Sequence, residues 1–150
     1  MRILDADIFA YALYDESPAH NQAWETVEKA LSGDIDLFIT HTTILETYNT
    51  LFWFYRVRPI KTLLEKLTLT LDGLTVVDPA ISGVQIAQTE NIPLGDGFLI
   101  GTALKHSKPI IVTNDPHIIK VAPKYGLITE NPIPDEVKKS LSTWKVESSK

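Results

Sequence analysis

Four carboxylate residues in this sequence are candidates for one shared site. Each stands beside the predicted start of a helix or the end of a short apolar run. Carboxylate oxygens are hard ligands that select Mg²⁺ or Mn²⁺, and such ions keep waters that can be activated for hydrolysis. Without a cation the acids would repel one another, so at least one should bind a proton more readily than a free carboxyl group. The four are Asp5, Glu46, Asp96 and Asp115.

The elements around these acids predict an α/β protein. Short apolar runs alternate with helical patterns, and such alternation implies right-handed crossovers and a parallel sheet covered on both faces. We therefore expect a three-layer α/β/α sandwich with a central parallel sheet of about five strands. The predicted strands are residues 3–4, 37–39, 74–77, 109–112 and 127–128, and the predicted helices are residues 7–14, 18–31, 44–56, 60–71, 79–89, 96–104, 117–124 and 134–141.

A parallel sheet would bring these acids to one edge, because ligands of open α/β sheets bind beyond the carboxyl ends of the strands. Asp5 and Asp115 each follow a predicted strand. Glu46 lies in the first turn of the helix after the second strand. Asp96 opens a helix and is placed at the same edge only by assumption.

Helix capping is the competing explanation for every one of these acids. Thr43 and Glu46 match the capping box, in which the glutamate reaches back to a backbone N–H. Asp115 precedes a proline, as an N-cap residue often does. Aspartate is a favoured N-cap, which accounts singly for Asp5, Asp7 and Asp96. Capping explains each acid alone, but it does not explain their common location.

Composition narrows the class of protein. A chain of 150 residues with 44% hydrophobic content suits one domain, which we place at residues 1–141, followed by a polar tail at residues 142–150. The absence of cysteine excludes disulfides and thiolate metal sites. No apolar run is long enough for a membrane span and no signal peptide is evident, so a cytoplasmic protein is expected. The net charge of −5 disfavours nucleic-acid binding unless acids are committed to cations.

The ordered set of acids resembles the PIN-domain family of metal-dependent ribonucleases, in particular VapC-type toxins of toxin–antitoxin pairs. The resemblance covers residues 1–129. It rests on Ile-Leu-Asp-Ala-Asp at 3–7, Thr-Ile-Leu-Glu-Thr at 43–47, Leu-Gly-Asp-Gly-Phe-Leu-Ile-Gly-Thr-Ala at 94–103 and Val-Thr-Asn-Asp-Pro-His-Ile at 112–118.

The resemblance implies a Mg²⁺- or Mn²⁺-dependent endoribonuclease with Asp5, Glu46, Asp96 and Asp115 as its catalytic and metal-ligating acids. It also implies an RNA substrate, a cognate antitoxin protein and a homodimer. Supporting residues would be Asp7, as an extra ligand or helix cap, and Thr113 and Asn114, through hydrogen bonds to the acids or the substrate. The sequence departs from the family pattern at Ala6, Asp7, Gly97 and Ile118.

Two other functions remain open from the sequence. A haloacid-dehalogenase-type phosphatase also begins with a strand and Asp-x-Asp, although Glu46 would have no role there. A non-catalytic PIN-like binding module is the other alternative. The aromatic helix at residues 44–56 is expected to serve dimerisation or antitoxin binding, since its consecutive aromatic side chains cannot all face one core. The histidines lack metal-ligand spacing and are interpreted as surface or near-site residues: His20, His41, His106 and His117.

Overall fold

The sheet has five parallel strands, as predicted. The computed structural model describes the backbone of residues 1–148 and the side chains of residues 1–144. The strand order is β3-β2-β1-β4-β5, so β1, the first strand of the chain, lies at the centre. The strands are β1 (Arg2–Leu4), β2 (Leu37–Thr40), β3 (Thr75–Val77), β4 (Ile110–Val112) and β5 (Thr129–Glu130).

Helices connect successive strands and cover both faces of the sheet, which confirms the predicted α/β class. No helix among the described residues is long and apolar enough to cross a membrane. The helical elements are α1 (Ala6–Leu13), α2 (His20–Leu31), α3 (His41–Asn49), the π-helix η1 (Thr50–Phe54), α4 (Ile60–Leu71), α5 (Gly83–Glu90), α6 (Leu94–Lys105), α7 (Pro116–Val121), the 3₁₀-helix η2 (Ala122–Tyr125) and α8 (Asp135–Ser148).

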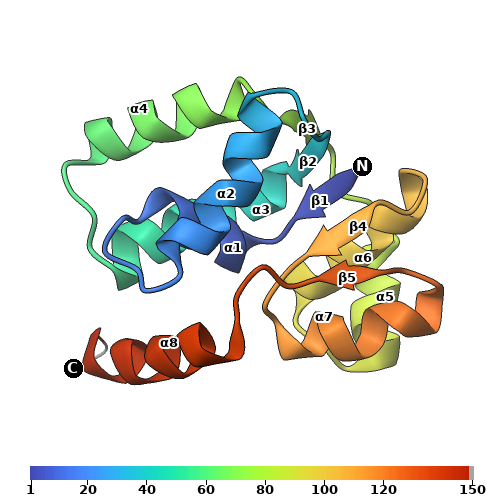
Figure 1. Ribbon diagram of the computed structural model, residues 1–150. Coiled ribbons are helices and arrows are strands. Elements are labelled where there is room, and N and C mark those ends of the chain that lie inside the picture. The colour runs from blue at the N-terminus through green and yellow to red at the C-terminus, as the bar shows by residue number, and fades with distance from the viewer. Residues whose placement is uncertain (149–150) are drawn as a thin grey trace.

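Alternate strand residues build two separate cores, because successive side chains of a strand point to opposite faces. In β1, Leu4 packs with α1, α2 and α4, whereas Ile3 packs with α5, α6 and α7. In β4, Val112 packs in the same core as Leu4, and Ile111 packs in the same core as Ile3. Figure 1 shows the first helix group on one side of the sheet and the second on the other. The three-layer architecture therefore follows from the strands being buried on both faces.

Several predicted boundaries were wrong by a few residues. The helix predicted at 18–31 begins at His20, because Ser17 instead accepts a hydrogen bond from the backbone N–H of Ala19 at 3.2 Å. The helix predicted at 79–89 begins only at Gly83. The last strand lies at Thr129–Glu130 instead of 127–128. There the carbonyl oxygen of Glu130 accepts a hydrogen bond from the backbone N–H of Thr113.

The C-terminal helix is longer than predicted. Instead of ending at residue 141, α8 continues to Ser148, and its Trp144 packs on Tyr14 and Tyr55 with ring centroids 5.9 and 4.9 Å away. Residues 149–150 of the predicted tail lie outside the described part of the chain. The division into a domain at 1–141 and a tail at 142–150 stays a prediction.

A glycine contact between α5 and α6 fixes the helix that carries Asp96. A Cβ at Gly97 would lie 2.4 Å from the carbonyl oxygen of Gly83, and one at Gly83 would lie 2.5 Å from Cα of Phe98. No side chain fits between backbones this close, and overpacking of this kind is destabilising. The close approach explains why glycine stands at position 97, one of the departures from the family pattern.

Candidate metal centre

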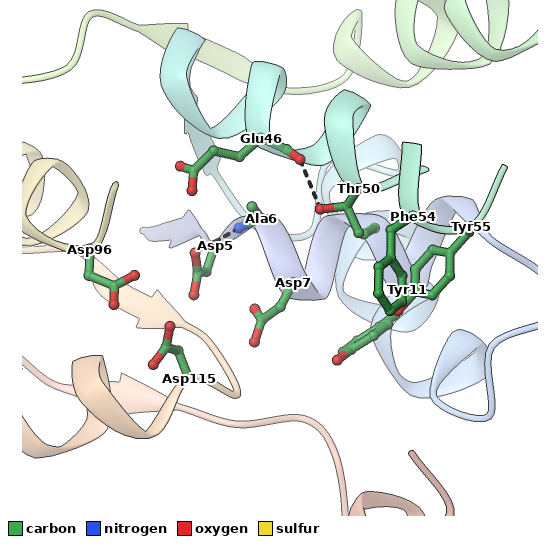
Figure 2. A pocket seen from close by; sticks show the side chains of 11 residues that line it. Asp5, Ala6, Asp7, Tyr11, Glu46, Thr50, Phe54, Tyr55, Asp96 and Asp115 are labelled. Atoms are coloured by element: carbon green, nitrogen blue, oxygen red, sulfur yellow. Dashed lines mark hydrogen bonds between the residues drawn. The ribbon is translucent and has the colours of Figure 1, made fainter. Parts of the chain in front are cut away.

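The four acids converge on one pocket at the carboxyl edge of the sheet. Asp5 directly follows β1, Asp115 lies beyond β4, Glu46 comes from α3 and Asp96 from the first turn of α6. Figure 2 shows their carboxylates pointing toward a common centre. All four line a cavity of about 380 Å³. The sheet thus assembles the set that the sequence predicted, including Asp96.

A threonine hydroxyl joins two of these acids. Asp5 accepts a hydrogen bond from the backbone N–H of Ala6 at 2.7 Å and, through its other oxygen, from the Thr113 hydroxyl at 2.6 Å. The Thr113 oxygen in turn accepts from the backbone N–H of Asp115 at 2.9 Å. Asp5 is therefore both the N-cap of α1 and a member of the acid cluster. Capping and a place in the site are compatible here.

Asp115 brings a histidine into the centre. Its carboxylate caps α7 by accepting from the backbone N–H of His117 at 2.8 Å, and His117 Nδ1 lies 3.1 Å from the same oxygen. One ligand atom each from Asp96, Asp115 and His117 lie within 4.8 Å of one another. Sequence spacing did not identify His117 as a ligand candidate. The sequence did contain one indication: His117 stands two residues after Asp115, the predicted N-cap, and this spacing places its ring beside the Asp115 carboxylate.

Asp96 is not a helix cap, contrary to the competing explanation. Pro93 occupies the N-cap position of α6, and Asp96 lies inside the first turn. Its side chain is only 10% exposed, and its buried Oδ2 accepts no hydrogen bond from any residue that the structure describes. His117 Nδ1, at 3.9 Å, is beyond hydrogen-bonding distance. Burial, together with the charges of Asp115 and Asp5, raises the pKa of Asp96 to about 8.

Glu46 is not part of a capping box either. Thr40 is the N-cap of α3 and accepts from the backbone N–H of Thr43 at 3.0 Å. The Glu46 carboxylate instead lies against Gly95, where a Cβ would come 2.6 and 2.7 Å from its two oxygens. Desolvation, followed by the charges of Asp5 and Asp115, raises the pKa of Glu46. The absence of a side chain at position 95 leaves room for this acid beside the site.

Replacing Gly95 with alanine should therefore push the Glu46 carboxylate away. We expect affinity for Mg²⁺ or Mn²⁺, measured by titration calorimetry, to fall roughly 10-fold, within the usual range for disturbed support of a metal ligand. The midpoint of thermal unfolding should change little, because the displaced group is the mobile end of a side chain. In a Glu46→Ala background the same substitution should have no further effect. Equal losses in both backgrounds would contradict a role through Glu46.

Asp7 also lines the pocket, but both of its oxygens accept backbone hydrogen bonds. The donors are the N–H groups of Ile8 at 2.7 Å and of Asn114 at 3.2 Å. Asn114 is held in turn by Asn131, whose amide donates to it at 2.8 Å. Burial and the charge of Asp5 raise the pKa of Asp7 well above its ordinary value. Asp7 thus ties the loop after β1 to the loop after β4.

The donor set suits a divalent cation of the Mg²⁺ or Mn²⁺ type. The four acids offer hard oxygen ligands, and within residues 1–144 none of them forms an ion pair with lysine or arginine. Burial raises the pKa of Asp5 as well. Oδ2 of Asp96 is the clearest sign, because it is buried and accepts no hydrogen bond from the described residues, with only His117 Nδ1 at 3.9 Å, and such an atom is costly without a hydrogen-bond partner. A bound cation would satisfy it and offset the repulsion among the acids.

The chain is similar to known proteins in sequence and in fold. The family model of the PIN domain matches residues 2–124. The crystal structure of PAE2754 from Pyrobaculum aerophilum is similar, with a TM-score of 0.60 and 20% identity, over 99% of this chain and 88% of the other.

VapBC2 from Rickettsia felis, solved bound to a DNA fragment from its promoter, has a TM-score of 0.63 and 18% identity. That match covers 87% of this chain and 97% of the other. No curated protein matches the chain. Since the family match spans most of the sequence, this protein belongs to the PIN domain family.

Proposed function

We propose that this protein is a divalent-metal-dependent endoribonuclease that hydrolyses RNA phosphodiester bonds and acts as the toxin of a toxin–antitoxin pair. One observation carries the proposal. Asp96 presents a buried carboxylate oxygen that accepts no hydrogen bond from the described residues, at the point where three further acids of a PIN domain converge. Without a cation, that desolvation is offset only by protonation of Asp96, whose pKa is about 8, whereas a bound divalent ion would stabilise the ionised carboxylate.

Each residue has a defined part in this mechanism. Asp5, Asp96, Asp115 and Glu46 would hold Mg²⁺ or Mn²⁺, and such an ion supplies Lewis-acid charge that activates water and neutralises the phosphate. Thr113 orients Asp5 through its hydroxyl. Asp7 and Asn114 keep the loops after β1 and β4 together. The acids need no histidine as a base in this scheme.

A protein partner is part of the proposal. The fold is shared with VapBC2, and an antitoxin bound to this chain would cover apolar surface that the chain leaves open. Leu45 on α3 and Leu64 and Leu69 on α4 are 59%, 46% and 72% exposed. We propose that a cognate antitoxin and a second copy of the chain bury surface of this kind. The proposed location is cytoplasmic.

The proposal is tested by incubating the protein with single-stranded RNA and either Mg²⁺ or Mn²⁺. We expect internal cleavage with either ion and none in excess chelator, with activity returning when the ion is restored. Cleavage that persists in chelator would rule out the metal-dependent mechanism. Hydrolysis of small phosphomonoesters without RNA cleavage would favour the phosphatase. If the protein hydrolyses neither RNA nor phosphomonoesters but binds a protein partner tightly, the non-catalytic binding module would be favoured.

A further inference from the structure

An aromatic side chain, Phe54, borders the pocket on the side away from Asp96. Phe54 and Thr50 line the same cavity as the four acids. Figure 2 shows Phe54 beside Tyr55, with Asp7 between this aromatic group and Asp96. The cavity therefore has a carboxylate end, suited to cations, and an aromatic end. Neither the acid cluster nor the proposed hydrolysis gives Phe54 a task.

A π-helix brings Phe54 to this side. In a regular α-helix of about 3.6 residues per turn, Phe54 would lie roughly 80° around the axis from Glu46. Instead, residues Thr50–Phe54 form a π-helix, closed by the hydrogen bond from Tyr55 N–H to the Thr50 carbonyl at 3.0 Å. The wider turn removes most of this offset, so Glu46, Thr50 and Phe54 face one pocket. Such π turns often occur at functional sites.

The neighbouring aromatics hold Phe54 in place and leave it exposed. Tyr55 stacks on Tyr14 with ring centroids 5.0 Å apart and an interplanar angle of 12°. The Phe54 ring meets Tyr55 edge to face, at 4.9 Å and 77°. Phe54 itself remains 44% exposed. An aromatic ring that packs against a neighbour, stays partly exposed and lies beside a site proposed to cleave phosphodiesters is the usual arrangement of a base-stacking platform.

We propose that Phe54 stacks on an unpaired nucleobase next to the scissile phosphate and positions the strand for cleavage. This inference rests on the proposed function and adds a specificity-determining residue to it. A cavity of about 380 Å³ is within the range for small-ligand sites, and its two ends match the two ends of a nucleotide. The phosphate lies at the carboxylate end through the cation, and the base lies on the ring. A base paired inside a duplex would first have to be flipped out of its stack, which costs stacking and pairing energy, so the proposed substrate is single-stranded.

The first experiment follows cleavage of a single-stranded RNA oligonucleotide in which one nucleotide at a time is made abasic. In the unmodified protein, one abasic position beside the cut should lower kcat/KM roughly 5- to 150-fold, the range for loss of one stacked base. In Phe54→Ala, kcat/KM for the intact RNA should fall by the same factor. Making the same nucleotide abasic should then cause no further fall in kcat/KM. Phe54→Trp should retain sensitivity to the abasic position.

Two control variants distinguish loss of stacking from loss of folding and from the loss of any exposed aromatic ring. Phe54→Leu keeps apolar bulk against Tyr55 but loses the flat ring, so it should behave as the alanine variant does while unfolding at the temperature of the unmodified protein. Trp53→Ala removes a neighbouring ring that is 68% exposed and does not line the pocket, and should leave kcat/KM unchanged. If the abasic nucleotide lowers kcat/KM as much in Phe54→Ala as in the unmodified protein, the inference is overturned.

A second readout does not depend on cleavage. With all four acids intact, we would bind a single strand carrying 2-aminopurine in the presence of Ca²⁺, which also takes hard oxygen ligands and is chosen in place of Mg²⁺ to slow hydrolysis. Stacking should quench its fluorescence with Phe54 present and fail to do so in Phe54→Ala, whether or not the unmodified protein cuts RNA. Equal quenching, or none with either protein, overturns the stacking role. A failure of cleavage alone would overturn only the proposed function. Weakened antitoxin binding with unchanged RNA readouts would assign the ring to a protein interface instead.

Discussion

Asp96→Asn is expected to lower RNA cleavage by at least ~100-fold, the upper end of what loss of a supporting partner of a metal ligand costs. Asparagine keeps the shape of the side chain but removes the charge that a divalent cation needs from this position. The same change should raise the thermal stability of the metal-free protein at pH 8 and above, where the Asp96 carboxyl, with a pKa of about 8, becomes ionised while it is buried and faces other acids. Kinetics and thermal unfolding measured on one preparation check both effects.

The matched control is Asp78→Asn. Asp78 also follows a strand, β3, but its side chain is 91% exposed and does not line the pocket. Within residues 1–144 its one ion-pair contact is with His41, at 3.4 Å. An exposed pair of this kind contributes little to stability. Neither cleavage nor unfolding should change measurably. If Asp96→Asn were as harmless as this control, Asp96 would not be a metal ligand.

In the absence of divalent ions, the protein should become less stable as pH rises from about 6 to 8. The pKa of Asp96 is about 8 in the folded protein and ~3.9 in an unfolded chain. Between these values the folded state binds more protons, so its stability is present at low pH and is lost as pH rises through the folded pKa. The raised pKa values of Asp5, Asp7 and Glu46 act in the same direction. Between pH 6 and pH 8, the ionisation of Asp96 alone should lower the free energy of unfolding by roughly 2 kcal/mol. This corresponds to a fall of about 4–8 °C in Tm.

Saturating Mg²⁺ should raise Tm most at pH 8, where it replaces the protons that the acids would otherwise hold, and should flatten the pH dependence. Asp96→Asn should flatten it as well, without metal. Differential scanning calorimetry in chelator and in Mg²⁺ measures all of these changes. A metal-free protein whose stability increases between pH 6 and pH 8 would show that the acids are ionised and compensated in another way.

The sequence was sufficient to predict the parallel sheet, because its short apolar runs alternate with helical patterns. It was also sufficient for Asp5 and Asp115, whose places follow directly from β1 and β4. Asp96 could be placed only by assumption, since its position depends on how closely α6 packs on α5. That packing depends on Gly83 and Gly97, and no local pattern reveals which two glycines meet.

Capping arguments used alone did not separate the acids that cap helices from those that do not. Asp5 and Asp115 do cap helices, whereas Glu46 and Asp96 do not, although capping was a possible explanation for all four. Thr40 takes the cap that Thr43 and Glu46 were expected to share, because the helix starts one turn earlier, directly after β2. The π-helix at Thr50–Phe54 was also not predictable. A widened turn depends on tertiary packing of the rings more than on helix periodicity.

The hydrogen bond from Thr113 to Asp5 joins residues 108 positions apart. During synthesis Asp5 is made more than 100 residues before Thr113, and β1 gains β4 as its neighbour only after Ile110–Val112 have been made. Contacts over such separations form late and slowly. A ribosome-bound fragment ending before Ile110 contains three of the four acids without the strand that aligns them. A nuclease built in this way would be inert during its own translation, while it remains close to the messenger RNA that encodes it.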